Sequence, residues 1–247
     1  MGTIFDKTAY EITLKILPEV CTSGKIKISQ LMMLHQNIGE QHLNAFGTTS
    51  QKMRDEQNLA FIFTKAAILI HRLPQEGEEI TLRTWCSELK GVRFTRNYQT
   101  FDKNGVRLTE CKCEVTTINL ESRRIVRPST INGFDDFLYN NELENLCNAP
   151  RKLSISDDLT LAKTVFITDD FIDFNNHVNN TVYADMMVSV VPDEKKSAPI
   201  KEVYINFVNE VLLNEEIELF ITTSDENHRV CGKIMGKLVF IGEMSFC

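Results

Sequence analysis

The sequence predicts an α+β fold of two tandem repeats, each a curved antiparallel β-sheet wrapped around one central α-helix. The first observation is the order of elements, because a helical pattern followed by a run of strand patterns occurs twice. The second is a local echo, since Glu78–Leu82 (EEITL) recurs as Glu215–Leu219 (EEIEL), an offset of 137 residues (215 − 78). Repeats of about 100 residues are too long for a solenoid. Two copies of one unit, placed side by side to form a continuous sheet, explain the pattern better.

In the first repeat, an amphipathic pattern predicts a helix over Ser29–Phe46. Ser29 can cap its start and Gly47 can end it. The apolar positions recur at spacings of three and four residues, at Leu31, Leu34, Ile38, His42, Ala45 and Phe46. The expected strands are rich in branched and aromatic residues and cover Leu59–Leu73, Glu79–Ser87, Arg93–Asp102 and Val106–Ile118. Asn104-Gly105 is a hairpin turn signal between the last two of them.

The second repeat shows the same order on a smaller scale. A short helix is expected over Thr181–Val191, closed by Pro192. The strands expected after it are Glu202–Phe207, Glu216–Thr223, Arg229–Ile234 and Leu238–Phe246. These patterns divide the chain into a first repeat over residues 1–130, a connector over residues 131–160 and a second repeat over residues 161–247. The connector carries Pro150 and a polar run over Asn140–Asn148.

Composition and charge exclude several classes of function. The chain of 247 residues is 43% hydrophobic and 25% charged, which is typical of a soluble globular protein. A net charge of −7 argues against nucleic acid as the main partner. The longest apolar stretch, Leu59–Ile70, is interrupted by Thr64 and Lys65 and is too short to span a bilayer. With no signal-peptide pattern at the N-terminus, we expect a cytoplasmic protein that does not enter the membrane.

The seven cysteines are scattered and odd in number, which does not suggest a disulfide framework. Cys111 and Cys113 are expected on the same side of one strand, and no histidine lies close enough to them in sequence to suggest a zinc site. We therefore expect reduced thiols, no metal and no cofactor.

A carboxylate, a carboxamide and an imidazole alternate directly before the second helix, at Asp173, Asn175 and His177. In an extended segment alternate side chains point the same way, so all three can converge on one pocket. Each residue alone has an ordinary explanation as a turn, cap or surface residue. The combination favours function, while Asn179 or Asn180 is expected to cap the helix. Aligning the helix starts places Ser23, Lys25 and Lys27 at the equivalent positions of the first repeat, so one site per chain is expected.

The chemistry that suits this trio is acyl transfer to water. A thioester carbonyl on the helix N-terminus would meet N–H dipoles where negative charge develops. Asp173 can attack directly or activate a water, His177 can protonate the leaving thiolate or orient the carboxylate, and Asn175 can hold either partner. Glu210 follows an alternating strand and precedes the apolar Val211-Leu212-Leu213, so it is either a partly desolvated general base or an exposed loop glutamate.

The segment Asp173-Phe-Asn175-Asn-His177-Val-Asn179-Asn180 resembles the Asp-x-Asn-x-His-x-Asn-Asn signature of the acyl-acyl-carrier-protein thioesterases of plants and bacteria. Arg72-Leu-Pro74 and Arg83-Thr-Trp85 are similar to further segments of that family. The resemblance implies a double hotdog fold, hydrolysis of the acyl thioester that ends fatty-acid synthesis, acyl carrier protein as the partner and no cofactor.

Carried over residue by residue, the resemblance marks Asp173, Asn175 and His177 as catalytic. It also matches Glu210 to the glutamate of the family's Glu-Cys pair. Val211 stands where that cysteine would be, so a mechanism that needs a cysteine nucleophile is disfavoured and a carboxylate route is favoured.

An acyl chain would occupy an apolar tunnel under the long helix and the strand segment Phe61–Ile70. Met32, Met33, Phe61 and Phe63 are the expected lining, with core packing as their alternative role. Because acyl carrier protein is acidic, docking requires a local basic patch on this acidic chain. The candidates are Arg123, Arg124 and Arg127, or Lys195, Lys196 and Lys201.

The alternative functions are an acyl-CoA thioesterase, a hydroxyacyl dehydratase and a non-catalytic module that binds acylated carrier protein. The sequence does not determine acyl chain length. It also leaves open whether the internal pair is complete or two chains form a homodimer.

Overall fold

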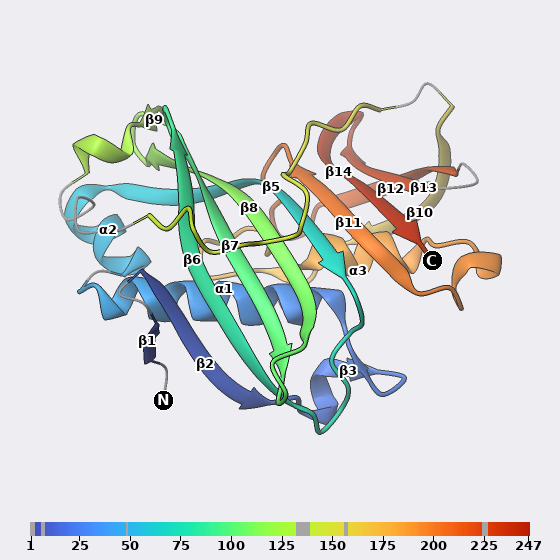
Figure 1. Ribbon diagram of the computed structural model, residues 1–247. Helices are drawn as coiled ribbons and strands as arrows, with labels where there is room; N and C mark the ends of the chain where they lie inside the picture. The colour runs from blue at the N-terminus through green and yellow to red at the C-terminus, as the bar shows by residue number, and fades with distance from the viewer. Residues whose placement is uncertain (1–2, 6–7, 48, 132–138, 156–157, 224–226) are drawn as a thin grey trace.

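A computed structural model describes residues 3–5, 8–47, 49–131, 139–155, 158–223 and 227–247. Within these residues, the chain forms one large antiparallel sheet in the order β1-β2-β6-β7-β8-β5-β11-β14-β13-β12-β10 (Figure 1). The strands of the first repeat are β1 (Thr3–Phe5), β2 (Ala9–Lys15), β5 (Leu59–Ile70), β6 (Glu79–Lys90), β7 (Arg93–Asp102) and β8 (Arg107–Asn119). Those of the second are β10 (Thr160–Phe166), β11 (Ile200–Phe207), β12 (Glu216–Thr223), β13 (Asn227–Ile234) and β14 (Lys237–Phe246).

The strand order shows that the two repeats have the same topology. Five strands, β2-β6-β7-β8-β5, curve around helix α1 (Ile28–Ala45), and five more, β10-β12-β13-β14-β11, curve around α3 (Val182–Ser189). The strands β5 and β11 pair antiparallel, with Ala67 opposite Tyr204, and so join both halves into one sheet. The predicted two-repeat α+β fold is therefore confirmed. The EEITL and EEIEL segments lie at the starts of β6 and β12, which are equivalent strands.

Smaller elements complete the fold. The helix α2 (Ser50–Gln57) follows α1, β3 (Cys21–Thr22) and β4 (Lys25–Ile26) form a hairpin before α1, and β9 (Ile125–Val126) pairs with the end of β8. Four single 3-10 turns lie at Pro18–Val20 (η1), Pro128–Thr130 (η2), Asp169–Phe171 (η3) and Asp193–Lys195 (η4).

Several expected details differ from the structure. Ser29 is not the cap of α1, because Lys27 takes that position and the Ser29 hydroxyl is buried without a hydrogen-bond partner among the described residues. The helix α3 covers only part of Thr181–Val191. The strand β10 was not expected; its residues are mostly exposed at the sheet edge and lack an apolar alternation.

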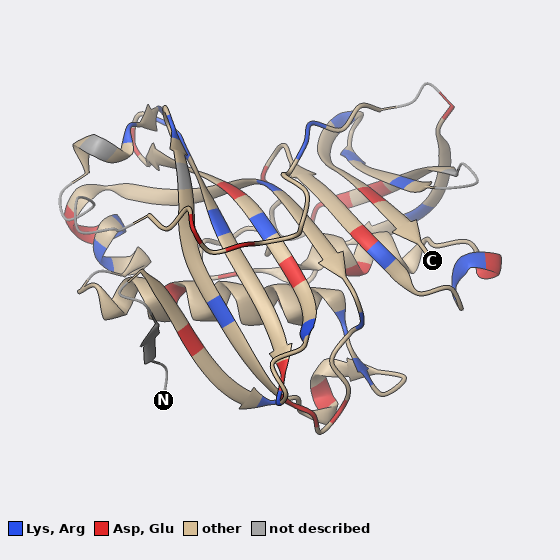
Figure 2. Cartoon of the chain, in the orientation of Figure 1, with Lys and Arg blue, Asp and Glu red and all other residues tan. Residues whose placement is uncertain are grey.

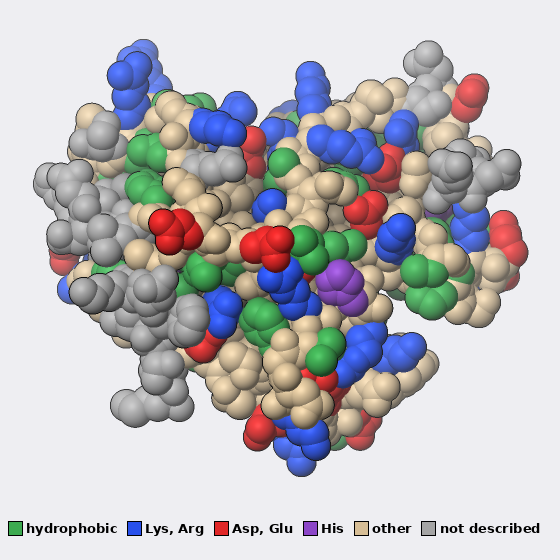
Figure 3. Space-filling model, in the orientation of Figure 1, with side chains coloured by type: hydrophobic (Ala, Val, Ile, Leu, Met, Phe, Trp, Pro, Cys, Tyr) green, Lys and Arg blue, Asp and Glu red, His purple; other side chains and the backbone are tan. Residues whose placement is uncertain are grey.

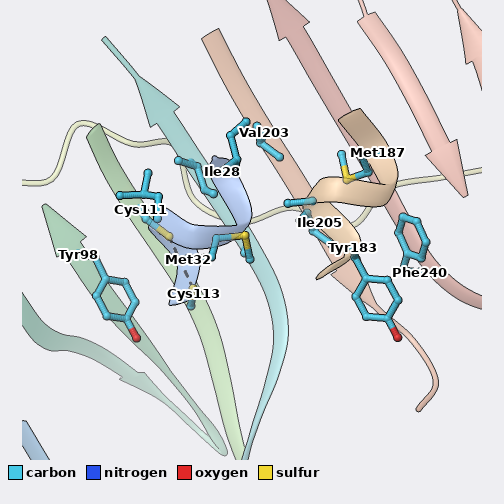
Figure 4. Packing of buried hydrophobic residues seen from close by; sticks show 14 of the residues in the cluster. Ile28, Met32, Tyr98, Cys111, Cys113, Tyr183, Met187, Val203, Ile205 and Phe240 are labelled. Atoms are coloured by element: carbon cyan, nitrogen blue, oxygen red, sulfur yellow. Dashed lines mark hydrogen bonds between the residues drawn. The ribbon is translucent and has the colours of Figure 1, made fainter. Parts of the chain in front are cut away.

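The core fills the space between the sheet and the two central helices (Figure 4). In α1, Leu31 and Ile38 are fully buried, and Tyr183 of α3 packs on Phe240 of β14 with ring centroids 4.7 Å apart. Gly242 on β14 is required by this packing, because a Cβ there would overlap the side chain of Met187. The close approach fixes α3, and therefore the segment before it, against the sheet.

The described part of the connector, residues 139–155, crosses the outer face of the sheet, opposite α1 (Figure 1). It is held there by hydrogen bonds from Leu146 N to Glu110 Oε2 (2.8 Å) and from Leu153 N to Asn206 Oδ1 (2.8 Å). Charged residues are spread over many of the strands, while α1 contains a single formally charged residue, Glu40 (Figure 2). Arg96 of β7 lies on the inner side of the sheet, where its Nη2 donates to Gly39 O of α1 (2.9 Å).

Candidate active site

A cavity of about 930 Å³ lies where the two repeats meet. Residues of α1, α2, β5, β7 and β8 form one part of its wall, and the segment from Asp173 to Tyr183 forms another. All four polar residues predicted from the sequence line it: Asp173, Asn175, His177 and Glu210. The structure thus brings together side chains that lie up to 37 residues apart (210 − 173).

The segment Asp173–His177 is a tight turn, not the extended segment expected from the alternation. Asp173 N donates to His177 O (2.8 Å), Asn176 N donates to Asp173 O (3.0 Å), and Ile172 and Val178 form an isolated β-bridge. Asn176 has φ of 62°, a left-handed conformation that asparagine tolerates better than most residues. The polar side chains therefore converge because the chain reverses direction.

The Asp173 carboxylate is held by Asn175 through both of its oxygens. Asn175 N donates to Oδ1 (2.7 Å), and Asn175 Nδ2 donates to Oδ2 (3.0 Å). On the other side of the amide, Arg54 Nη2 of α2 donates to Asn175 Oδ1. Sequence reasoning missed Arg54, because it lies 121 residues before Asn175 and no local signal marks it.

A second pair consists of His177 and Glu210, with Nε2 and Oε2 3.3 Å apart. Arg123 Nη1 donates to the other oxygen of Glu210 (3.1 Å). The Glu210 side chain is 48% exposed, which agrees with the exposed alternative and not with a partly desolvated one. Backbone geometry brings Glu210 to the site, because Val178 N donates to Val211 O (2.9 Å) and so places the segment after β11 beside the turn.

Asn179 accepts hydrogen bonds from two backbone N–H groups at the start of α3. Its Oδ1 accepts from Thr181 N (3.0 Å), and its backbone oxygen accepts from Val182 N (3.0 Å). The capping position itself is Thr181 by backbone geometry, so Asn179 lies two residues before the standard cap. From the sequence we expected free N–H groups here that could bind a ligand. The N–H groups of Thr181 and Val182 are instead hydrogen-bonded within the protein.

The remaining wall of the cavity is largely apolar. Met33, Phe61 and Phe63 line it, together with Leu43, Phe94, Val115 and Ile118. Phe61 and Phe94 meet edge to face, with centroids 5.7 Å apart. Met32 does not line the cavity: it is buried in the core (Figure 4), because adjacent residues of a helix point about 100° apart. We therefore exclude Met32 from the candidate substrate wall.

All seven cysteines lie in the described residues, are free thiols, and are absent from the cavity wall. Burial raises the pKa of the Cys86 thiol, and a hydrogen bond with Cys113, together with burial, raises that of the Cys111 thiol. Val211, at the position matched to the family's cysteine, is fully buried. Thiol alkylation of the native protein should therefore modify mainly the exposed Cys247 and leave catalysis unchanged. Activity before and after alkylation, with the modified residues identified by mass spectrometry, tests this. Loss of activity against which substrate protects would point to a cysteine mechanism.

Among the described residues, no three His, Cys, Asp or Glu side chains are placed to hold a metal ion. In the same described residues, no helix is both long enough and apolar enough to cross a bilayer.

Two models of known protein families match this chain. Residues 5–130 match the model of the acyl-ACP thioesterase N-terminal domain, and residues 157–237 match that of the C-terminal domain. The chain belongs to the acyl-ACP thioesterase family. Together the two matches cover most of both repeats, including the whole Asp173–Asn180 segment and Glu210.

Two curated plant proteins are similar in sequence. The palmitoyl-acyl carrier protein thioesterase of Arabidopsis thaliana is 26% identical over 156 residues, which are 60% of this chain and 37% of that protein. The dodecanoyl-[acyl-carrier-protein] hydrolase of Cinnamomum camphora is 25% identical over 191 residues, which are 73% of this chain and 48% of that protein. The matches thus span less than half the length of both relatives, which are described as chloroplastic.

Solved structures show the same fold. An acyl-ACP thioesterase from Bacteroides thetaiotaomicron superposes with a TM-score of 0.87 at 19% identity, covering 97% of this chain and 98% of that one. The 12:0-ACP thioesterase of Umbellularia californica superposes with a TM-score of 0.82 at 17% identity, covering 99% of each chain. The expected double hotdog fold is thereby confirmed over almost the entire chain.

Proposed function

We propose that the protein hydrolyses the thioester of a fatty acyl-acyl carrier protein to free fatty acid and carrier protein. The observation that carries this proposal is a cavity that holds Asp173, Asn175, His177 and Glu210 together and whose remaining wall is largely apolar. The plant relatives bear names for this type of activity. A thioester at the polar end would leave its acyl chain against Met33, Phe61 and Phe63.

The contacts suggest a division of labour within the site. Asp173, fixed by Asn175, is the group that attacks the carbonyl carbon or activates the water that does so. His177, paired with Glu210, protonates the departing thiolate of the phosphopantetheine arm. In this scheme residues 1–130 supply the acyl-binding wall, residues 161–247 supply the reacting groups, and residues 131–160 connect the two.

Of the two basic clusters considered for carrier docking, we favour Arg123, Arg124 and Arg127. All three are exposed, and Arg123 lines the cavity. In the other cluster, Lys196 pairs with Asp193 (2.6 Å) and Lys195 lies over the Phe246 ring. On the face shown in Figure 3 acidic and basic side chains are interspersed, so an acidic partner would depend on a local patch. A role in fatty-acid synthesis, a cytoplasmic location and a homodimer stay predictions.

A panel of acyl thioesters tests the proposal. Saturated and unsaturated acyl groups from short to long, each on acyl carrier protein and on coenzyme A, are assayed for release of free thiol. We expect hydrolysis with a higher kcat/KM for the carrier-protein series. Preference for coenzyme A would indicate an acyl-CoA thioesterase, and tight binding without turnover a non-catalytic module. Thiol release from a saturated substrate excludes a role limited to dehydration.

Replacing Glu210 with glutamine should slow hydrolysis roughly 10-fold, less than the loss of a complete acid–base group. The variant keeps the shape of the side chain but removes the charge that faces His177 Nε2. Steady-state thiol release measures the effect. The matched control is Glu216→Gln, the same change at an exposed residue outside the cavity wall. Equal rates for both variants would show that Glu210 is an ordinary exposed loop residue.

A further inference from the structure

The helix α2 brings a charged side chain of the first repeat to the polar end of the cavity. Met53 is 2% exposed and anchors α2 in the core. At its start, Ser50 donates from N (2.8 Å) and from Oγ (2.5 Å) to the Glu40 carboxylate of α1. At its end, Asn58 adopts the left-handed conformation (φ 56°), and its backbone oxygen accepts from Leu120 N after β8 (2.8 Å). The helix is thus fixed at both ends and along its buried side.

Arg54 on this anchored helix reaches across the junction between the repeats. Its Nη2 donates to Asn175 Oδ1, and its guanidinium carbon lies 5.9 Å from the centre of the Phe174 ring. The side chains of Arg54, Phe174 and Asn175 all line the cavity. The contact continues through the amide to Asp173, because Asn175 Nδ2 donates to Asp173 Oδ2 (3.0 Å).

This chain of contacts determines which way the Asn175 amide faces. A guanidinium only donates hydrogen bonds, so the amide group turned toward Arg54 must be the oxygen. The NH₂ group is then turned toward the Asp173 carboxylate, which only accepts when ionised. Both charges oppose rotation of the amide by about 180°, because it would bring the amide oxygen against the carboxylate and the NH₂ group against the guanidinium; without Arg54 only the carboxylate opposes it.

We infer that Arg54 is a positioning residue of the second-repeat site: it acts through Asn175 to hold Asp173 in its reactive geometry. The inference rests on the proposed hydrolysis and extends it, because the active site then requires a residue of the first repeat. A charged donor also polarises the amide and strengthens its bond to Asp173. The second pair of the site, His177 and Glu210, has a similar arrangement, because Arg123 of the first repeat holds Glu210 beside His177.

Kinetics of two Arg54 variants and one control test the inference. Arg54→Ala should lower kcat roughly 10- to 100-fold and change KM by less than about 3-fold, because geometry at the reacting group is lost while the acyl wall remains. Arg54→Lys should recover part of kcat, since an ammonium donates one bond without the planar fork. Added methylguanidinium should partly restore Arg54→Ala.

The control is Lys52→Ala, which removes a positive charge from the same helix. Lys52 is exposed, does not line the cavity, and donates to Gly47 O (3.2 Å). We expect its kinetics to match the wild type. A purely structural role of Arg54 would give no rescue by methylguanidinium, and a role in carrier docking would raise KM and leave kcat unchanged. Either result would overturn the inference.

Thermal stability tests the contact between Arg54 and Asn175 independently of catalysis. The melting temperatures of Arg54→Ala, Asn175→Ala and the double variant should be non-additive, with the double variant losing less than the sum of the two. Additive shifts would contradict the contact. Failure of the inference is distinguishable from failure of the proposed function: in the first case the wild type hydrolyses acyl thioesters and Arg54→Ala behaves like Lys52→Ala. In the second, the wild type itself releases no thiol, and the inference falls with it.

Discussion

Replacing Asp173 with asparagine is expected to lower kcat by at least about 10²-fold while the fold stays intact, the scale of losing a general base or nucleophile. The native carboxylate receives both donors of Asn175, at 2.7 and 3.0 Å. An asparagine of the same shape has only one accepting oxygen and can neither take a proton from water nor attack a carbonyl carbon effectively. Steady-state thiol release from an acyl thioester measures the loss, and thermal melting verifies the fold.

The control for Asp173→Asn is the same substitution at a neighbouring aspartate that does not line the cavity. Asp170, three residues earlier, is exposed, and Asp170→Asn should turn over at the wild-type rate. If a well-folded Asp173→Asn protein also turned over normally, Asp173 would have no chemical role. The candidates for catalysis would then reduce to the pair of His177 and Glu210, whose Nε2 and Oε2 lie 3.3 Å apart.

The fold could be predicted because the same order of hydrophobic patterns, helical and then strand-like, occurs in both repeats. The strands Arg93–Asp102 and Glu216–Thr223 match their predicted limits, since turn residues bound them on each side. The helix over Ser29–Phe46 is displaced by one residue at each end, to Ile28–Ala45. Helix ends depend on local backbone geometry that periodicity does not contain.

The site was only partly predictable. Asp173, Asn175 and His177 lie within five consecutive residues that form one turn, so a local motif could mark them. Arg54 and Arg123 come to the same place through the pairing of the two repeats, and a local pattern contains no information about such long-range contacts. Met32 and Met33 illustrate a different limit: both are apolar on one helix, and only the direction of the helix relative to the sheet decides which one faces the cavity.

The inequality of the repeats also has a structural reason. In the first repeat the segment before the central helix is the β3–β4 hairpin, with Ser23 and Gly24 at its turn (φ 52° and 73°). None of Ser23, Lys25 and Lys27 lines the cavity. In the second repeat the equivalent turn faces α2 of the first. One polar cluster per chain follows, with each repeat contributing a different part of it.

Acidification should destabilise the fold through two buried histidines of α1. Burial lowers the pKa of His35 to about 3, and His35 stacks on the Tyr98 ring with centroids 4.6 Å apart. Burial, with a smaller effect of the Arg96 charge, lowers the pKa of His42 to about 2. Both rings are therefore neutral in the folded protein at pH values where an unfolded histidine, with a pKa near 6.5, is charged.

The sign follows from proton counting. Below about pH 6.5 the unfolded chain binds protons at these positions and the folded chain does not, so the free energy of unfolding falls as the pH falls toward the folded values. The full stabilisation is present above pH 6.5. Between pH 7 and pH 5 each histidine should remove about 2 kcal/mol from the free energy of unfolding, at roughly 1.4 kcal/mol per pH unit once the pH is well below 6.5.

Urea unfolding of the wild type and of His35→Phe at several pH values between 7 and 5 measures this effect. Phenylalanine keeps an aromatic ring against Tyr98 and cannot be protonated, while the carboxylates that also titrate in this range are the same in both proteins. The wild type should therefore lose about 2 kcal/mol more than His35→Phe between pH 7 and pH 5. Parallel curves for the two proteins would mean that the His35 ring gains a proton in the folded state, in spite of its burial between α1 and the sheet.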